Sequence, residues 1–417
     1  MASHPLRTAV FLTAVLFYYI SCMPGLLHAV QAVSARNFIQ HGGYALAQNS
    51  HIAMAQNSTT PFIPASTLKI ITSLAALDIL GPDYHFSTLI SRDQQNNLYI
   101  QGSGDPFLLT ENIIAIVQRL HESGIREINN LVMDESVYQL DFPADGCENT
   151  TNPYDAWNGG LAVNFNSIAI RVAPDRAVSS DDPKVPFLPM MQTIGATLPP
   201  GNYHLNVNAF KATGQLSNTL RYSGELFAAL LAQKQIVVRG AIIAGQTPTT
   251  AAPLLTYQSD KTVQEMIKQC LKYSNNFVAN QLFLACGSAR LGKPATWEKS
   301  RTVLRTYINE DLGISEAELV MFEGSGLSRR NRITPRAMIT VLQKFAPYQE
   351  LLPIKKGFPL KSGRLTGVYC YAGYLPQQQN APFVILLNQA QNNRDEILHI
   401  LSSGHKPTTA FAAGNTL

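Results

Sequence analysis

The pattern of hydrophobic residues changes twice along the chain, and this constrains the fold more than any other feature of the sequence. Residues 66–80 and 262–285 carry apolar side chains at helical spacing, whereas residues 89–257 alternate short strands with helices. Strand patterns return near the carboxyl end. A long stretch of different texture between such segments is typical of a domain that holds an insertion. We therefore predict a mixed α/β protein of the α+β type, in which residues 33–88 and 258–417 form one split domain and residues 89–257 an inserted α+β region.

Local patterns predict the individual elements within this frame. Period-two alternation indicates strands, and apolar residues three and four apart indicate helices. Before the insert we expect two strands within 44–56 and a helix over 66–80, ended by Gly81-Pro82. The remaining expected elements are strands over 97–101, 163–172, 204–210, 236–244, 360–363, 368–375 and 383–388, and helices over 111–123, 223–234, 262–271, 277–285 and 394–402.

Composition allows large cores and excludes a nucleic-acid partner. The chain has 417 residues, enough for two or three domains, and 46% of them are hydrophobic. Lys and Arg number 32 against 28 Asp and Glu, so the net charge is only +4. Because no stretch is rich in Lys or Arg, the sequence lacks the basic footprint of a nucleic-acid-binding protein.

The amino end reads as an export signal. Arg7 precedes an apolar run over 9–19, and Ala32 follows in a small-residue cleavage pattern, so residues 1–32 are expected to be a signal peptide that directs the protein to the periplasm. A transmembrane anchor is the alternative, but Pro24 interrupts the run short of the roughly 20 apolar residues that a span needs. A lipid anchor on Cys22 is a second alternative.

Four cysteines remain after such cleavage. Both disulfides and partly buried free thiols are compatible with an exported chain that has four cysteines. The sequence has no C-x-x-C and no His pair at zinc spacing, so we expect no metal site. The four are Cys147, Cys270, Cys286 and Cys370.

The first chemical motif places a hydroxyl and an amine on one helical turn. Ser66 and Lys69 form S-x-x-K at the start of the first expected helix. A serine becomes nucleophilic when a base takes its proton, and a lysine whose pKa is lowered by burial or by a nearby cation can be that base. The alternative is a helix-capping serine with a solvated lysine.

A second polar motif interrupts two expected helices. Ser274 and Asn276 form S-x-N, where the hydroxyl could relay a proton and the amide could align a substrate peptide bond. A simple interhelical turn is the alternative.

A third motif lies on an expected strand. Lys361-Ser362-Gly363 offers a cation and a hydroxyl for a carboxylate, with a glycine that lets a substrate backbone approach the strand. An edge strand carrying a protective lysine is the alternative.

Together the three motifs resemble one family. The same triplet occurs in penicillin-binding proteins and class A β-lactamases. Further segments extend the likeness over most of residues 40–390, and the chain resembles the class C penicillin-binding proteins, which are D-alanyl-D-alanine carboxypeptidases and endopeptidases of the bacterial cell wall. The segments are Pro64–Lys69, Gly102–Pro106, Glu323–Arg329 and Lys361–Gly367.

The resemblance implies a fold, an activity and roles for site residues. It implies a penicillin-recognising transpeptidase-like domain, an antiparallel sheet flanked by helices, with catalytic Ser66, Lys69 and Ser274. It implies peptidoglycan peptides as substrates, β-lactam antibiotics as covalent inhibitors and no cofactor; it leaves the oligomeric state open. The substrate-binding residues that it implies are Asn276, Lys361, Ser362, Gly363, Arg364 and Arg329, with backbone N–H groups of Ser66 and Arg364 as the oxyanion hole. For Arg329 a surface salt bridge is the alternative.

The chain departs from the family pattern at three places. Ser362 replaces the usual Thr, Asn275 replaces the usual Asp, and 147–154 differ in a neighbourhood that in the family helps to select the stem peptide. A serine β-lactamase, which shares the motifs, and a catalytically silent wall-binding protein are the alternative functions. The long insert favours the peptidase, and the intact motifs argue against the silent protein.

Overall fold

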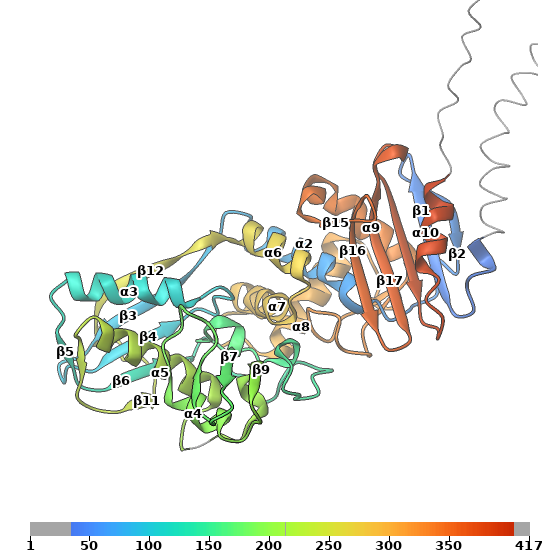
Figure 1. Ribbon diagram of the computed structural model, residues 1–417. Helices are drawn as coiled ribbons and strands as arrows, with labels where there is room; N and C mark the ends of the chain where they lie inside the picture. The colour runs from blue at the N-terminus through green and yellow to red at the C-terminus, as the bar shows by residue number, and fades with distance from the viewer. Residues whose placement is uncertain (1–34, 213, 404–417) are drawn as a thin grey trace, which may run out of the picture.

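The computed structural model describes residues 35–212 and 214–403 (Figure 1). The expected signal peptide at 1–32 therefore lies outside the described residues. Figure 1 shows two lobes, with a six-stranded sheet in one, a five-stranded sheet in the other, and helices α6, α7 and α8 between them. The six-stranded sheet with its helices confirms the predicted class, an antiparallel sheet flanked by helices beside a second α+β region.

The six-stranded sheet joins the two ends of the chain. Every neighbouring pair is antiparallel, and β1 lies between its hairpin partner β2 and the late strand β18. In sheet order the strands are β15 (Ile354–Lys355), β16 (Phe358–Leu365), β17 (Val368–Leu375), β18 (Ala381–Leu387), β1 (Gly42–Gln48) and β2 (His51–Gln56). Helix α10 (Arg394–Ser402) packs on one face through a core that includes Tyr44 and Phe383.

The other face of this sheet packs on a helical layer. Alternate residues of β1, β17 and β18 enter the largest core together with α2 and α9, because successive side chains of a strand point to opposite faces. The helices of this layer are α2 (Lys69–Ile79), α6 (Val263–Tyr273), α7 (Asn276–Leu291), α8 (Trp297–Thr306) and α9 (Pro335–Phe345). Shorter elements here are the 3-10 helices η1 (Ala65–Leu68) and η6 (Ala346–Leu351), the π-helix η5 (Tyr307–Asp311) and the pair β13 (Leu319–Val320) and β14 (Arg332–Ile333).

The second lobe has its own core and three sheets. The five-stranded sheet runs β11 (Ile242–Ala244), β6 (Leu131–Asp134), β4 (Leu98–Gly102), β3 (His85–Arg92) and β12 (Ala252–Thr262). The three-stranded sheet runs β8 (Val178–Ser180), β7 (Ser167–Val172) and β9 (Gly201–Asn206), and β5 (Glu127–Ile128) pairs with β10 (Val237–Val238). Its helices are α3 (Thr110–Glu122), α4 (Pro189–Gly195) and α5 (Asn218–Gln233), with the 3-10 turns η2 (Pro153–Asp155), η3 (Asn164–Asn166) and η4 (Val207–Ala209).

The predicted domain boundaries fall inside two long strands. β3 and β12 pair with each other in the five-stranded sheet, and the boundaries at 88/89 and 257/258 lie within them. The two strands carry the chain out of the helical layer and back to it (Figure 1).

Some expected strands are shorter than their patterns. The segment 163–172 begins with η3, where Asn164, Phe165 and Asn166 all have positive φ, so the strand β7 starts only at Ser167. Left-handed backbone cannot continue a strand ladder. The segment 236–244 forms two strands, β10 and β11, which pair with different partners. The expected strand over 204–210 is the end of β9 and stops at Asn206, directly before η4.

All four cysteines that follow the expected signal peptide have free thiols, so the disulfide alternative is wrong. Cys270, Cys286 and Cys370 are buried, and Cys147 is half-buried. No helix in residues 35–212 and 214–403 has the length and apolar character needed to cross a membrane.

Candidate active site

The three sequence motifs meet at the junction of η1, α7 and β16. The Lys69 amine lies 3.1 Å from the Ser66 hydroxyl and 2.8 Å from the side-chain oxygen of Asn276. The Lys361 amine lies 2.8 Å from the Ser274 hydroxyl. Contacts that span 207 positions of the chain (Lys69 to Asn276) and 87 positions (Lys361 to Ser274) therefore bring the motifs into one polar cluster.

The turn that carries Ser66 is held by two glycines from other elements. Ala65, directly before Ser66, has a φ of 46°, a left-handed conformation that is costly for a residue with a side chain. A Cβ on Gly326 would lie 1.9 Å from the Ala65 carbonyl oxygen, and one on Gly363 would lie 2.8 Å from the Pro64 carbonyl oxygen. Only glycine permits this approach, so the loop around 326 and the strand β16 fix the position of η1.

Lys69 is a fully buried amine with three oxygen neighbours. Besides Ser66 and Asn276, it donates to the Ser325 carbonyl at 2.7 Å. Burial lowers the pKa of Lys69 to about 8, although the nearby groups Cys270 and Glu323 act in the opposite direction. An amine with this pKa is partly neutral near physiological pH, and only the neutral form can accept the proton of a hydroxyl.

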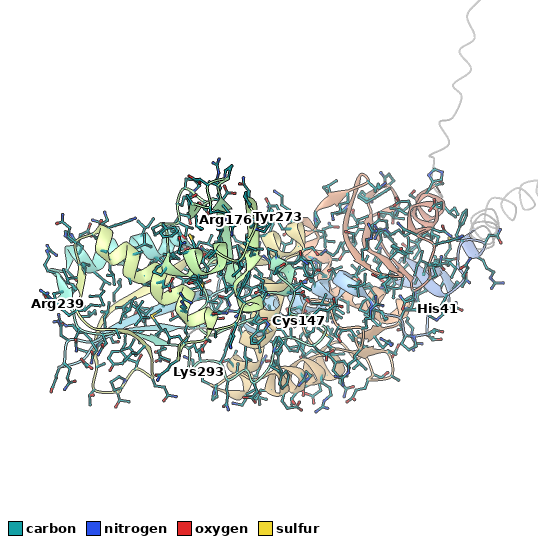
Figure 2. All side chains as sticks on the ribbon, turned by 60° about the horizontal axis from the view of Figure 1, so that its bottom comes forward. His41, Cys147, Arg176, Arg239, Tyr273 and Lys293 are labelled. Atoms are coloured by element: carbon teal, nitrogen blue, oxygen red, sulfur yellow. The ribbon has the colours of Figure 1, made fainter. Side chains whose placement is uncertain are left out.

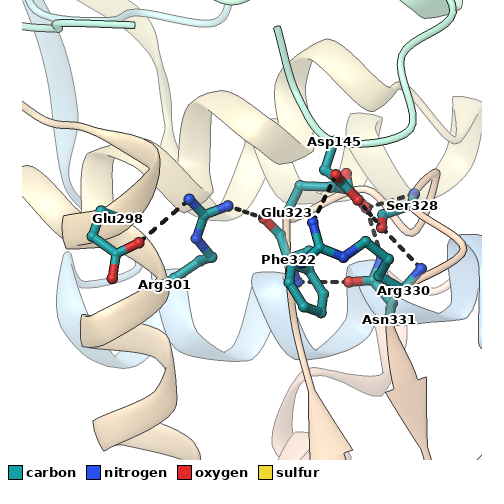
Figure 3. Close-up of polar contacts among 8 residues, drawn as sticks. All are labelled: Asp145, Glu298, Arg301, Phe322, Glu323, Ser328, Arg330 and Asn331. Atoms are coloured by element: carbon teal, nitrogen blue, oxygen red, sulfur yellow. Dashed lines mark hydrogen bonds and ion pairs between the residues drawn. The ribbon is translucent and has the colours of Figure 1, made fainter. Parts of the chain in front are cut away.

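A buried carboxylate shapes the loop that faces Lys69. The Glu323 side chain is fully buried and accepts the N–H groups of Ser325 at 2.7 Å and Gly326 at 2.8 Å, and the Asn331 side-chain amide at 2.8 Å. These bonds present the Ser325 carbonyl to Lys69. Figure 3 shows Glu323 beside Asn331 and Ser328 in this loop. The segment Glu323–Arg329 contributed to the family resemblance, but the sequence motifs predicted no role for Glu323. A glutamate directly before Gly-Ser-Gly was the available signal, because such a loop exposes N–H donors.

The S-x-N motif joins α6 to α7. Ser274 ends α6 in a left-handed conformation with a φ of 58°, and the side chain of Asn275 caps α7 by accepting the Val278 N–H at 3.0 Å. Asn275 therefore performs the capping that suits an aspartate at this position. Asn276 follows as the first residue of α7, with its side chain toward Lys69.

The third motif lies on β16. Lys361 is buried and also donates to the Ser362 carbonyl at 2.9 Å. Burial, together with the nearby cations of Lys69 and Lys355, lowers the pKa of Lys361 well below its usual range. The Ser362 hydroxyl accepts a hydrogen bond of 2.8 Å from Lys355 on β15, a residue that sequence reasoning did not select.

A cavity of about 660 Å³ opens beside Ser66. Of the predicted site residues, Ser66, Ser274, Asn276, Arg329 and Arg364 line it. Lys69, Lys361 and Gly363 are buried, and Ser362, which lies between the last two on β16, is half-buried. The insert contributes six further lining residues: Asp145, Gly146, Cys147, Glu148, Tyr154 and Asp155.

The insert loop is attached to the active-site loop by polar contacts. Asp145 contacts the Ser328 hydroxyl and pairs with Arg330 at 3.2 Å (Figure 3). The Tyr154 carbonyl accepts the Asn276 amide at 3.2 Å. Cys147 lies near the middle of the molecule, where the two lobes meet (Figure 2). The segment 147–154, which departs from the family pattern, therefore forms part of the cavity wall.

Arg329 lies at the mouth of the cavity. Its guanidinium donates to the Thr366 carbonyl at 2.7 Å and is exposed. It takes part in none of the ion pairs within the described part of the chain. The salt-bridge alternative therefore has no partner there, and a role in substrate binding stays a prediction.

Comparison with known proteins agrees with this architecture. The D-alanyl-D-alanine carboxypeptidase DacB of Haemophilus influenzae is 26% identical over 403 aligned residues, which cover 82% of this chain and 83% of that protein. The D-alanyl-D-alanine carboxypeptidase of Actinomadura sp. is 26% identical over 321 residues, 67% of this chain and 59% of that protein.

Solved structures show the same fold. The crystal structure of penicillin-binding protein 4 from Haemophilus influenzae matches with a TM-score of 0.72 at 20% identity, over 89% of this chain and 98% of that one. A second structure of that protein, in complex with a β-lactam, matches with a TM-score of 0.69 at 21% identity and covers the same shares. The predicted penicillin-recognising transpeptidase-like fold is confirmed.

A family profile extends over the greater part of the chain. The D-Ala-D-Ala carboxypeptidase 3 (S13) family matches residues 40–360, a span that includes S-x-x-K, the whole insert and S-x-N, and that ends directly before Lys361. The Ser66–Lys69 pair lies within this span. The chain therefore belongs to the D-Ala-D-Ala carboxypeptidase 3 (S13) family of serine hydrolases.

Proposed function

We propose that this protein is a serine-type D-Ala-D-Ala carboxypeptidase and endopeptidase that cleaves peptidoglycan stem peptides through an acyl-enzyme on Ser66. The observation that carries the proposal is the buried Lys69 amine, 3.1 Å from the Ser66 hydroxyl at the edge of an open cavity. A nucleophile within hydrogen-bond reach of a base whose pKa is near 8 is the arrangement that acyl transfer needs.

Acylation begins when neutral Lys69 takes the proton of Ser66. The Ser66 oxygen then bonds to the carbonyl carbon of the penultimate D-Ala, and backbone N–H groups of Ser66 and Arg364 hold the oxyanion. The loss of one such donor typically lowers turnover by about 10²–10³-fold. Asn276, which contacts Lys69, aligns the substrate amide.

The leaving group departs as an amine. The bond between carbonyl carbon and nitrogen breaks, and Ser274 passes a proton to that nitrogen while Lys361 holds the Ser274 hydroxyl at 2.8 Å. Water then hydrolyses the acyl-enzyme and restores Ser66. Ser362 and Arg329 bind a carboxylate of the substrate, and Gly363 lets the substrate backbone approach β16.

β-Lactams are the inhibitors that this mechanism predicts. Their strained amide acylates the same serine, and the Haemophilus influenzae relative is described in complex with a β-lactam. Family membership favours the peptidase over the two alternatives, the serine β-lactamase and the silent wall-binding protein. Because peptidoglycan lies outside the cytoplasmic membrane, we also propose that residues 1–32 export the protein to the periplasm.

A labelled penicillin tests the proposal. The purified protein is incubated with the label, digested and mapped by peptide mass spectrometry, and we expect one adduct, on Ser66. Label elsewhere, or no label, contradicts the assignment. Digestion of purified peptidoglycan by the wild-type protein, with a Ser66→Ala variant as control, then shows whether release of D-Ala or cleavage of cross-links dominates.

A further inference from the structure

A cation that belongs to none of the three motifs lies beside the third one. Lys355 is on β15, which pairs with β16 through Lys355 and Phe358. The tight turn between these strands contains Lys356 and Gly357, both with positive φ. This turn fixes Lys355 at the edge of β16, and its amine reaches along that strand to the Ser362 hydroxyl at 2.8 Å.

Lys355 is the third amine in this part of the molecule, with Lys69 and Lys361. Its charge and that of Lys69 both lower the pKa of Lys361, so the three amines are electrostatically coupled. The pKa of Lys355 itself is lowered by partial burial and by the nearby guanidinium of Arg394. Arg394 is held against β16 by a hydrogen bond to the Gly363 carbonyl at 2.9 Å and against β17 by one to the Cys370 carbonyl at 3.4 Å.

This concentration of positive charge has no internal counter-ion at Lys355. Among the ion pairs of residues 35–212 and 214–403, none includes Lys355 or Lys361, whereas the adjacent Lys356 pairs with Asp395 at 3.2 Å. Bringing cations together without carboxylates is unfavourable, and either the loss of a proton, which the lowered pKa of Lys361 favours, or a bound anion relieves the repulsion. The position therefore suits an anion that binds next to Ser362.

The hydrogen bond also orients the Ser362 hydroxyl. Because Lys355 donates to its oxygen, the hydroxyl proton must point elsewhere and remains available to an acceptor. Serine lacks the β-branch that restricts the rotamers of threonine, so a partner for its oxygen does more to order it than it would for threonine.

We propose that Lys355 is a positioning and specificity-determining residue, which holds the Ser362 hydroxyl and supplies positive charge for the terminal carboxylate of the substrate. The inference rests on the proposed function, because it concerns the leaving D-residue of that same reaction. It predicts that Lys355 contributes to the cleavage of peptides with a free carboxylate and not to those in which this carboxylate is an amide.

The test compares two substrates in four proteins. The substrates are a diacylated L-Lys-D-Ala-D-Ala peptide and the same peptide with a C-terminal amide, and the quantity measured is the ratio of their kcat/KM values, acid over amide. The proteins are the wild type, Lys355→Met, Lys355→Arg and the matched control Lys356→Met, which removes a neighbouring charge that pairs with Asp395 instead.

We expect Lys355→Met to lower the acid-to-amide ratio about tenfold, since the loss of a hydrogen bond to a charged group typically costs about that factor. Lys355→Arg should keep the ratio within about threefold of wild type because it retains a cationic donor. Lys356→Met should leave the ratio unchanged. A Lys355→Gln variant repeats the measurement if the Met variant does not fold.

Two results overturn the inference while leaving the proposed function intact. In the first, the wild-type enzyme cleaves the acid peptide, but the Lys355→Met or Lys355→Gln variant has the same acid-to-amide ratio as the wild type. The second is a Lys356→Met variant whose ratio falls as far as that of Lys355→Met. A wild-type enzyme that cleaves neither peptide refutes the proposed function itself, and the inference with it.

Discussion

At the scale of single residues, Lys69 determines what the site can do. Its amine is fully buried, yet all of its oxygen neighbours are uncharged groups: a hydroxyl, an amide and a carbonyl. A carboxylate in direct contact would keep the lysine protonated, whereas burial favours the neutral amine. Glu323 acts from further away, because its oxygens are occupied by the loop 325–331.

The rate of acylation should therefore rise with pH through about 8, the pKa of Lys69. Below that pH the amine carries a proton and cannot accept another from Ser66; above it the amine is neutral. Stopped-flow measurement of the second-order rate constant for a chromogenic β-lactam between pH 6 and 9.5 checks this.

The control for that profile is Lys69→Arg, which keeps the charge but stays protonated over this range. We expect its rate to be lower by about 10²–10⁴-fold, the usual contribution of a general base, and the rise near pH 8 to disappear. A flat wild-type profile, or a variant with wild-type rates, would exclude Lys69 as the base.

At the scale of elements, the site depends on how closely β16 and the 323–331 loop approach η1. Gly326 has a φ of 84° and is in contact with the Ala65 carbonyl, so its lack of a side chain serves both conformation and space. The left-handed Ala65 then directs Ser66 toward the cavity. These contacts between segments far apart in the chain position the nucleophile, since η1 is only one turn long.

Gly326→Ala should displace the Ser66 turn and lower the rate of β-lactam acylation at least about tenfold. Displacement of reacting groups by about 1 Å can cost 10²-fold. The matched control is Gly124→Ala, which has a similar φ of 88° but no atom near the position of the added Cβ. Both variants incur the conformational cost of a left-handed alanine, so equal acylation rates in the two would refute the steric argument.

At the scale of the whole molecule, helix α7 connects the two lobes. Gln281 on this helix is fully buried and donates to two carbonyls of the insert, Gly104 at 3.1 Å and Gly159 at 3.0 Å. Asn158 of the insert returns a bond to Gln281 at 3.1 Å and donates to the Phe277 carbonyl at 3.0 Å. Since α7 begins at Asn276, the same helix that aligns the substrate amide also holds the insert that forms the cavity wall.

Gln281→Leu should lower both stability and acylation. It removes the partner of two buried carbonyls, and each unsatisfied group typically costs about 1–3 kcal/mol. Thermal unfolding followed by circular dichroism measures the first effect and β-lactam acylation the second. Gln343→Leu, at an exposed position on α9, is the control for the change of residue type. A Tm equal to that of the control variant would show that these bonds contribute nothing.

Much of the fold could be predicted from local patterns, because they reflect local physics. The strand β17 and the helix α10 have the predicted bounds. The helix buries an apolar stripe at helical spacing, whereas the strand is an apolar run that is buried along almost its whole length. The patterns failed at η3 and at the β10–β11 segment. There the backbone conformation follows from contacts with distant partners: Asn164 bonds to Thr110 and Tyr222, and β11 pairs with β6.

The sequence by itself determined the chemical groups and their order: a hydroxyl and an amine one turn apart at Ser66 and Lys69, a polar break at 274–276, and a cation on a strand at Lys361. These follow from spacing within single elements, which backbone geometry fixes. The tertiary structure alone decided that Glu323 orders the loop facing Lys69, that Lys355 reaches Ser362, and that the insert forms one wall of the cavity. Each is a contact between segments far apart in the chain, and no local rule relates their positions.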